Sequence, residues 1–221
     1  MDAFLAQFFN IDIMAQAAPL ILHGLGMTLR VCAAVVPLGL AGGLAAALAG
    51  RSRSRGIRFV VAMLIDIFRA VPPLVLLIFV YAGLPFAGLR LSPFAAVCVA
   101  FFLNTSAYYG EIYRAGLESV GAGQREAARS TGLSAWQAMA YVVIPQAVRN
   151  VLPDLVSNTI EVVKLTSLAS VVALPEMLYS ADMARSLTYN SSPIVLAALV
   201  YLLLLWPFVR LTSRLEHRLG G

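Results

Sequence analysis

Residues 121–145, GAGQREAARSTGLSAWQAMAYVVIP, are the longest hydrophilic interruption in a mostly apolar chain, and the rest of the sequence is organised around them. After Gly121 and Gly123, residues 124–129 favour a helix, and Gly132 interrupts this run. Ser134 stands where the N-cap of a second short helix is expected. The pattern therefore predicts two short helices joined by a glycine, with small alanines that allow another surface to approach closely.

The rest of the composition is that of a helical membrane protein. Of the 221 residues, 60% are hydrophobic and 12% are charged, and the mean hydropathy is +0.84. Such a chain has too few polar groups to cover a folded surface in water. The sequence therefore predicts an all-α polytopic membrane protein. Its net charge of +5 comes from arginines at the ends of apolar runs, which indicates membrane topology and contact with lipid headgroups rather than nucleic-acid binding.

Five apolar runs are long enough to cross a bilayer. We expect spans at about 24–49, 59–84, 94–117, 148–173 and 194–209, in one transmembrane domain that covers residues 1–221. Residues 51–58 hold four arginines, and Arg210, Arg214 and Arg218 follow the last span. Because cytoplasmic loops are rich in arginine, the N-terminus is predicted outside and the C-terminus inside. Residues 1–23 are mildly amphipathic and are expected to lie along the outer surface. Residues 175–193, between the last two spans, are expected to form an outer loop.

The sequence gives no sign of catalysis. Lys164 is the only lysine, and no glycine-rich turn precedes it, so the chain has no P-loop. No HExxH motif occurs, and Cys32 and Cys98 both lie inside apolar runs, as small buried residues do. No catalytic residue, metal or cofactor is therefore assigned to this chain, and any use of ATP requires another subunit.

Charged residues inside the predicted spans are a second unusual feature. Three acid–base pairs have a spacing of three: Asp66/Arg69, Glu111/Arg114 and Glu161/Lys164. Residues three apart share one helical face, so each pair can neutralise itself. The first and last pairs lie about 16–22 Å into a hydrocarbon core about 30 Å thick. Each ionisable side chain there costs about 2.5–3.5 kcal/mol on insertion scales, which indicates a cavity or a partner.

Other polar groups reach the same depth. Asn104 and Tyr108 do so in the third span, and Pro72-Pro73 breaks the second span and frees backbone carbonyls. We hypothesise that one central polar path for a zwitterionic substrate is lined by Asp66, Arg69, Asn104, Tyr108, Glu161, Lys164, Thr166 and Ser167. The carboxylates would meet the amino group of the substrate, and Arg69 its carboxylate. The alternative is that these charges only hold the helices together.

The 121–145 stretch resembles the EAA loop of permease subunits in ABC importers. The likeness rests on Glu126-Ala127-Ala128, Gly132, Val142, Ile144 and Pro145, with Ile144 where leucine is usual. Other motifs resemble the polar amino-acid subfamily: residues 107–112, 123–124, 145–147, 164–168 and 68–72, the last with Ala-Val where Gly-Thr or Gly-Val is commoner before the proline. The resemblance covers roughly Thr28 to Leu215.

The resemblance implies a type I ABC importer permease fold in a bacterial cytoplasmic (inner) membrane. It implies that a cleft of an ATPase subunit holds the coupling segment through Gln124, Glu126, Ala127, Ala128 and Gly132. The implied partners are an ATPase dimer that binds ATP and Mg, a second identical or similar permease, and an extracytoplasmic amino-acid-binding protein. The alternatives are a permease for a different solute, a passive channel or scaffold and, for the stretch itself, a helix that rests on headgroups.

Overall fold

A computed structural model describes the backbone of residues 1–219 and the side chains up to Glu216, so the side chain of Arg218 lies outside the described residues. Within this part the chain is mostly helical, with short 3-10 and π-helical segments and no strand. The predicted all-α architecture is confirmed.

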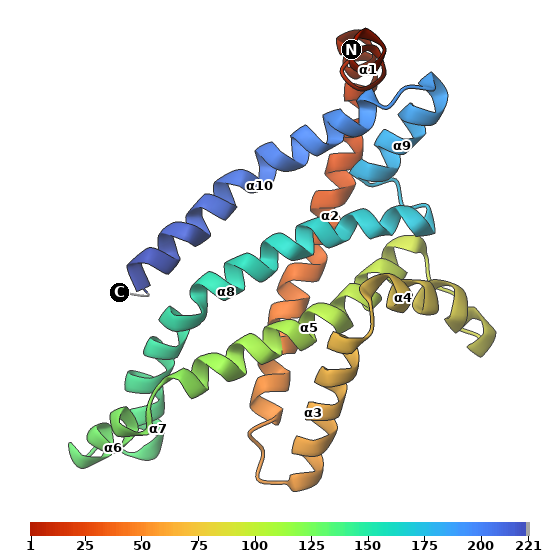
Figure 1. Cartoon of the computed structure of the whole chain (residues 1–221). Helices are drawn as coiled ribbons and strands as arrows, with labels where there is room; N and C mark the ends of the chain where they lie inside the picture. The colour runs from red at the N-terminus through yellow and green to blue at the C-terminus, as the bar shows by residue number, and fades with distance from the viewer. Residues whose placement is uncertain (220–221) are drawn as a thin grey trace.

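Helix α2 (Ile11–Ala49) is the longest element and crosses the other long helices (Figure 1). A short helix, α1 (Asp2–Phe8), precedes it, and Asn10 caps α2 by accepting a hydrogen bond from the Ile13 backbone nitrogen at 3.2 Å. Residues 11–23 therefore belong to the first long helix, although they were expected to lie along the membrane surface. The helix runs without interruption through Pro19 into the first predicted span.

Three helices, or four if one bent pair is a single span, are long and apolar enough to cross a membrane, where the sequence predicts five spans. By length and composition, α2, the helical run from Ala135 to Val172 and α10 (Ser192–Leu219) can each cross a membrane. Helix α3 (Arg55–Ala70) and residues 73–87 qualify together as a fourth span, bent by 101°. Helix α5 (Pro93–Ser119) has 27 residues and is about 40 Å long, although polar residues such as Asn104 lower its hydropathy.

The shorter helical segments connect these spans. They are α4 (Pro73–Ile78), η1 (Phe79–Gly83), η2 (Leu84–Ala87), α6 (Ala122–Ser130), α7 (Ala135–Ala138), η3 (Met139–Val143), α8 (Ile144–Leu165), η4 (Thr166–Val172) and α9 (Met177–Thr188). The segment from 175 to 193, expected as an outer loop, is mostly the helix α9. Its N-cap is the fully buried Glu176, whose carboxylate accepts hydrogen bonds from the Leu178 and Tyr179 backbone nitrogens at 2.8 and 2.6 Å.

Helices α2 and α5 pack along a seam of small residues. Gly39 and Gly42 face Thr105 and Ser106 of α5. A Cβ atom added at Gly43 would lie 2.6 Å from the Tyr109 Cβ and 2.7 Å from the Gly110 backbone nitrogen. Small residues let two membrane helices approach until their backbones touch. The glycine-rich composition of the first span is thus explained by its contact with α5.

The end of α3 depends on a side chain from α5. Pro72 has no N–H group, so the carbonyl group of Phe68, four residues earlier, has no helical donor. The side-chain nitrogen of Asn104 donates to this carbonyl at 3.0 Å, and Asn104 is only 4% exposed. A polar backbone group inside a membrane needs such a partner. The predicted break in the second span is therefore stabilised by a contact between two spans.

We expect Gly43→Ala to destabilise the chain by about 1–3 kcal/mol, because the added methyl group collides with backbone atoms of α5. The matched control is Gly26→Ala in the same helix, where the methyl group meets open space. Thermal unfolding of the detergent-purified proteins, followed by circular dichroism, measures both. Equal melting temperatures for the two variants would contradict the close seam.

Candidate functional site

The coupling segment, residues 121–145, lies at the end of the molecule opposite α1 and α9 (Figure 1). It forms the two predicted short helices, α6 and α7, followed by η3 and the start of α8. Ser134 accepts from the Gln137 backbone nitrogen at 3.2 Å, and the Gln137 side chain accepts from the Ser134 backbone nitrogen at 2.8 Å. This reciprocal capping box confirms the predicted N-cap.

The residues predicted for coupling have two different environments. Gln124, Glu126 and Ala127 are exposed on α6, whereas Ala128 is only 7% exposed and packs inward. Arg125 fixes α6 to the end of α5 by donating from Nη2 to the Leu117 carbonyl at 2.8 Å. The segment is thus held firmly on one side, and it presents a carboxylate, an amide and a small residue on the other.

Gly132 stands at the bend between the two helices. Its φ of +91° lies in the left-handed region that favours glycine, and a Cβ atom there would meet no other atom within 4 Å. Nearby, Trp136 and Tyr141 are 74% and 72% exposed. Exposed aromatic side chains beside a rigid bend are typical of an interaction surface. Sequence reasoning missed these two aromatics, because helical spacing alone does not show which face is covered.

Most residues of the predicted substrate path gather in one cavity between α5 and α8, which we call the polar cavity. Its volume is about 440 Å³. It is lined by Pro73, Asn104, Thr105, Tyr108, Asn158, Glu161, Val162, Lys164, Leu165, Ser167 and Leu168. The Lys164 Nζ donates to Glu161 Oε1 at 2.5 Å, and both side chains are more than half exposed. The cavity therefore presents a neutralised ion pair that an incoming charged group can open.

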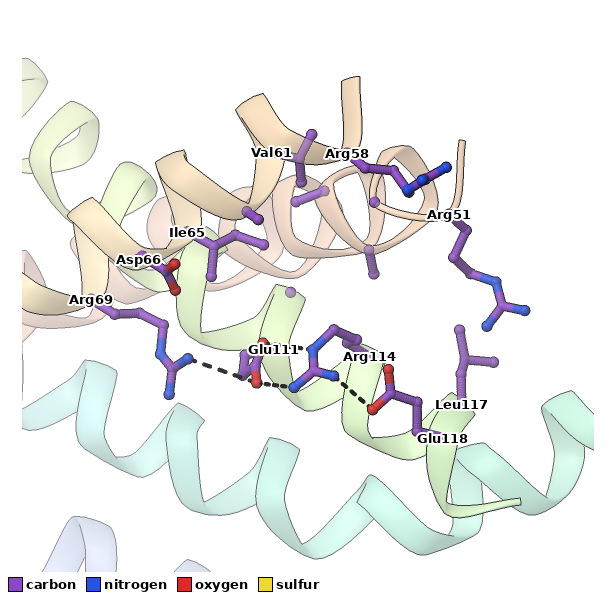
Figure 2. A pocket seen from close by; sticks show the side chains of 15 residues that line it. Arg51, Arg58, Val61, Ile65, Asp66, Arg69, Glu111, Arg114, Leu117 and Glu118 are labelled. Atoms are coloured by element: carbon purple, nitrogen blue, oxygen red, sulfur yellow. Dashed lines mark hydrogen bonds and ion pairs between the residues drawn. The ribbon is translucent and has the colours of Figure 1, made fainter. Parts of the chain in front are cut away.

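Three predicted path residues lie outside the polar cavity. Asp66 and Arg69 line a second cavity, of about 420 Å³, between α2, α3 and α5 (Figure 2), which we call the arginine cleft. It is lined by Ala46, Ala47, Gly50, Arg51, Arg58, Val61, Ala62, Ile65, Asp66, Arg69, Gly110, Glu111, Arg114, Leu117 and Glu118. Thr166 is fully buried and lines neither cavity, and its hydroxyl donates to the Val163 carbonyl at 2.7 Å.

Arg69 lies between the two cavities. Its guanidinium carbon is 5.6 Å from the ring centre of Tyr108, which lines the polar cavity. Its Nη1 is 3.8 Å from Glu111 Oε1, in the arginine cleft. Among residues 1–216 no ion pair joins Arg69 to Asp66, the partner that spacing suggested. Helical spacing brings the pair to one face, but the contact with α5 determines where the guanidinium points.

Comparison with known proteins identifies the family. Residues 39–221 match the family described as binding-protein-dependent transport system inner membrane component. The glutamine transport system permease protein GlnP of Escherichia coli is 35% identical over 218 residues, which are 96% of this chain and 98% of that protein. The arginine transport system permease protein ArtQ of Bacillus subtilis is 32% identical over 214 residues, which are 95% of this chain and 98% of that protein.

The chain belongs to this permease family. A solved structure described as an amino acid ABC transporter with histidines superimposes with a TM-score of 0.89 at 37% identity, and the match covers 95% of this chain and 98% of that one. The inward-facing MetNI methionine ABC transporter, at 17% identity and a TM-score of 0.74, shares the fold. The permease is accordingly a multi-pass membrane transport subunit of the importer type, and it is not itself catalytic.

Sequence reasoning missed Asn158 in the polar cavity of the permease. Its side-chain nitrogen is buried and has no hydrogen-bond partner among the described residues. Asn158 lies three residues before Glu161, as Glu161 lies three residues before Lys164, so all three share one face of α8. This periodicity was a usable signal. The side chain of Asn158 adds a polar amide to the wall of the cavity.

Asn104 and Asn158 line the same cavity, but we assign a structural role to Asn104 and a binding role to Asn158. We expect Asn104→Ala to lower the free energy of unfolding by about 1–3 kcal/mol, because the Phe68 carbonyl loses its donor in an apolar setting. Asn158→Ala removes an amide whose nitrogen has no partner in the described chain, so we expect a smaller loss. Thermal unfolding in detergent compares them, and an Asn158→Ala variant that unfolds first would contradict this assignment.

Proposed function

We propose that this permease imports a polar amino acid, and that the polar cavity is its substrate path. The cavity offers an acid, a base and the amide of Asn158 on α8, opposite Tyr108 of α5. An amino acid at neutral pH carries both an ammonium and a carboxylate group, so Glu161 and Lys164 match it when their ion pair opens. The relatives named for glutamine and for arginine support this class of solute.

The observation that carries the proposal is the Glu161–Lys164 pair in an open cavity at membrane depth. Charges at such a depth are rare and normally face a pathway or a partner. Both side chains are reachable, since Glu161 is 66% and Lys164 is 52% exposed. Arg69 lies over the ring of Tyr108, which lines the cavity. Its guanidinium group would therefore attract the carboxylate of the substrate as the substrate leaves the cavity.

The coupling segment is proposed to transmit the work of a partner ATPase. Gln124, Glu126, Ala127 and Gly132 would contact the partner, while Ala128 packs α6 against the permease. Two ATPase subunits would bind ATP and Mg, and a second permease and an extracytoplasmic binding protein would complete the importer. The N-terminus would lie outside and the C-terminus inside, which agrees with the separation of α1 from the coupling segment (Figure 1).

We predict that Glu161→Gln lowers amino-acid uptake about tenfold, because the substrate ammonium loses its carboxylate. Asp66→Asn is the matched control, since it also removes one acid within a span but lies in the arginine cleft. Uptake of labelled glutamine and arginine into proteoliposomes measures both, with assembly of the importer checked by size exclusion. Uptake that remains normal in Glu161→Gln contradicts the proposed path.

Gly132→Asn tests the coupling contact. Asparagine tolerates positive φ better than most residues, so this variant limits the backbone strain and adds a side chain on the open side. We predict that membrane insertion and assembly persist while uptake falls at least about fivefold, an effect of roughly 1 kcal/mol. ATP hydrolysis and uptake are measured on the same proteoliposomes. Uptake at the unsubstituted level would mean that Gly132 is needed only for its conformation.

A further inference from the structure

We propose that the arginine cleft binds an anionic phospholipid, with its phosphate between Arg51 and Arg58 and part of an acyl chain along the apolar wall. The cleft is separate from the polar cavity, and the transport mechanism proposed above makes no use of Arg51 or Arg58. The ligand class follows from the charge, the shape and the position of the cleft.

The first argument is the charge at one end of the cleft. Figure 2 shows Arg51 and Arg58 together there, with Asp66 and Arg69 at the other end. Arg58 donates through Nη1 to the carbonyl groups of Ser52 and Arg53, at 3.0 and 3.3 Å, which orients its guanidinium. Within residues 1–216 no carboxylate forms an ion pair with either arginine. Two cations therefore remain for an anion from outside the chain.

The carboxylates of the cleft are already engaged. Arg114 lies between Glu111 and Glu118, bound to Glu111 Oε2 through Nε at 2.9 Å and to Glu118 Oε2 through Nη1 at 2.6 Å. Figure 2 shows this triad between the two ends of the cleft. Because Arg114 satisfies both acids of α5, neither competes strongly for the guanidinium groups at the mouth. Guanidinium groups bind phosphate oxygens with two parallel hydrogen bonds.

The second argument is the apolar wall. Ala46 and Ala47 of α2, Val61 and Ile65 of α3, and Leu117 of α5 line the cleft. Its volume of about 420 Å³ falls in the usual range of ligand sites, about 300–1,000 Å³. A free phosphate ion would use only the arginines, whereas a phospholipid would use the arginines and this wall. The combination therefore favours the lipid.

The third argument is position. Arg51 follows the end of α2 at Ala49, and Arg58 lies in the first turns of α3, so both mark the end of a span. In the proposed topology this is the level of the lipid phosphates on the cytoplasmic side. Basic pockets between transmembrane helices on the cytoplasmic side suit anionic headgroups. Small residues, Ala46, Ala47 and Gly50, keep this end of the cleft open.

The test is a lipid titration of the full-length chain, purified in a neutral detergent and followed by native mass spectrometry. We expect dioleoylphosphatidylglycerol to bind, and the double variant R51Q/R58Q to bind it about tenfold more weakly, because two charge-assisted contacts are lost. The matched control is R53Q/R55Q, which removes two arginines that do not line the cleft. Unchanged affinity in R51Q/R58Q, or an equal loss in R53Q/R55Q, overturns the proposal.

Two further sets of measurements test which kind of ligand binds and whether it binds in the arginine cleft. Dioleoylphosphatidylcholine should bind at least about tenfold more weakly than the anionic lipid, and inorganic phosphate at equal concentration should not displace it. Ala62→Phe, an exposed position on the cleft wall, should also weaken binding while leaving every charge in place. Displacement by inorganic phosphate, equal binding of both lipids, or full binding by Ala62→Phe would each overturn the proposal. None of these measurements depends on transport.

Discussion

The carbonyl group of Phe68 needs a hydrogen-bond donor that its own helix cannot supply, because Pro72 has none. Asn104 of α5 meets this need from a neighbouring span. In water a solvent molecule would serve, but inside a bilayer the protein must provide the donor. The bend of 101° between α3 and the segment after it therefore depends on the position of α5.

That position depends in turn on the contact between α2 and α5. Without side chains at Gly39, Gly42 and Gly43, the two helices approach to backbone contact, and Tyr109 and Gly110 pack against the seam. Lipid is as apolar as the helices, so close packing replaces the hydrophobic effect as the force that joins them. Helix α5 then holds polar residues on two sides, towards α8 in the polar cavity and towards α3 in the arginine cleft.

The contacts of the charged residues within the helices follow from this arrangement. Glu161 and Lys164 neutralise each other on one helix, and Arg114 joins Glu111 and Glu118 on another. Arg69 differs, because its contacts are on α5, with Glu111 and with the ring of Tyr108. The guanidinium group of Arg69 thus has one weak contact in each cavity and links the two. Helical spacing alone therefore accounts for the ion pairs within one helix, whereas the contacts of Arg69 depend on how α3 packs against α5.

Several features of this protein can be read from its residues alone. Its composition indicated membrane helices, Pro72-Pro73 indicated the break, Ser134 indicated the cap of α7, and the motif around Glu126 indicated the family. These features depend on residues close together in the chain, so local chemistry is enough to read them. The same reasoning placed residues 11–23 on the membrane surface and expected a loop where α9 lies, because amphipathic and polar composition does not specify whether a helix continues.

The division of the polar residues between the two cavities follows from the packing of the helices and not from the sequence pattern. Asp66 and Glu161 have similar depth and similar spacing to a base, yet they line different cavities. Asn104 appeared suited to a substrate but holds a backbone carbonyl, and Asn158 was overlooked although its amide nitrogen is unpaired within the described chain. The reason is physical. Which side of a helix faces a cavity depends on its rotation against neighbours from distant parts of the chain, and hydrophobicity along the sequence does not record that rotation.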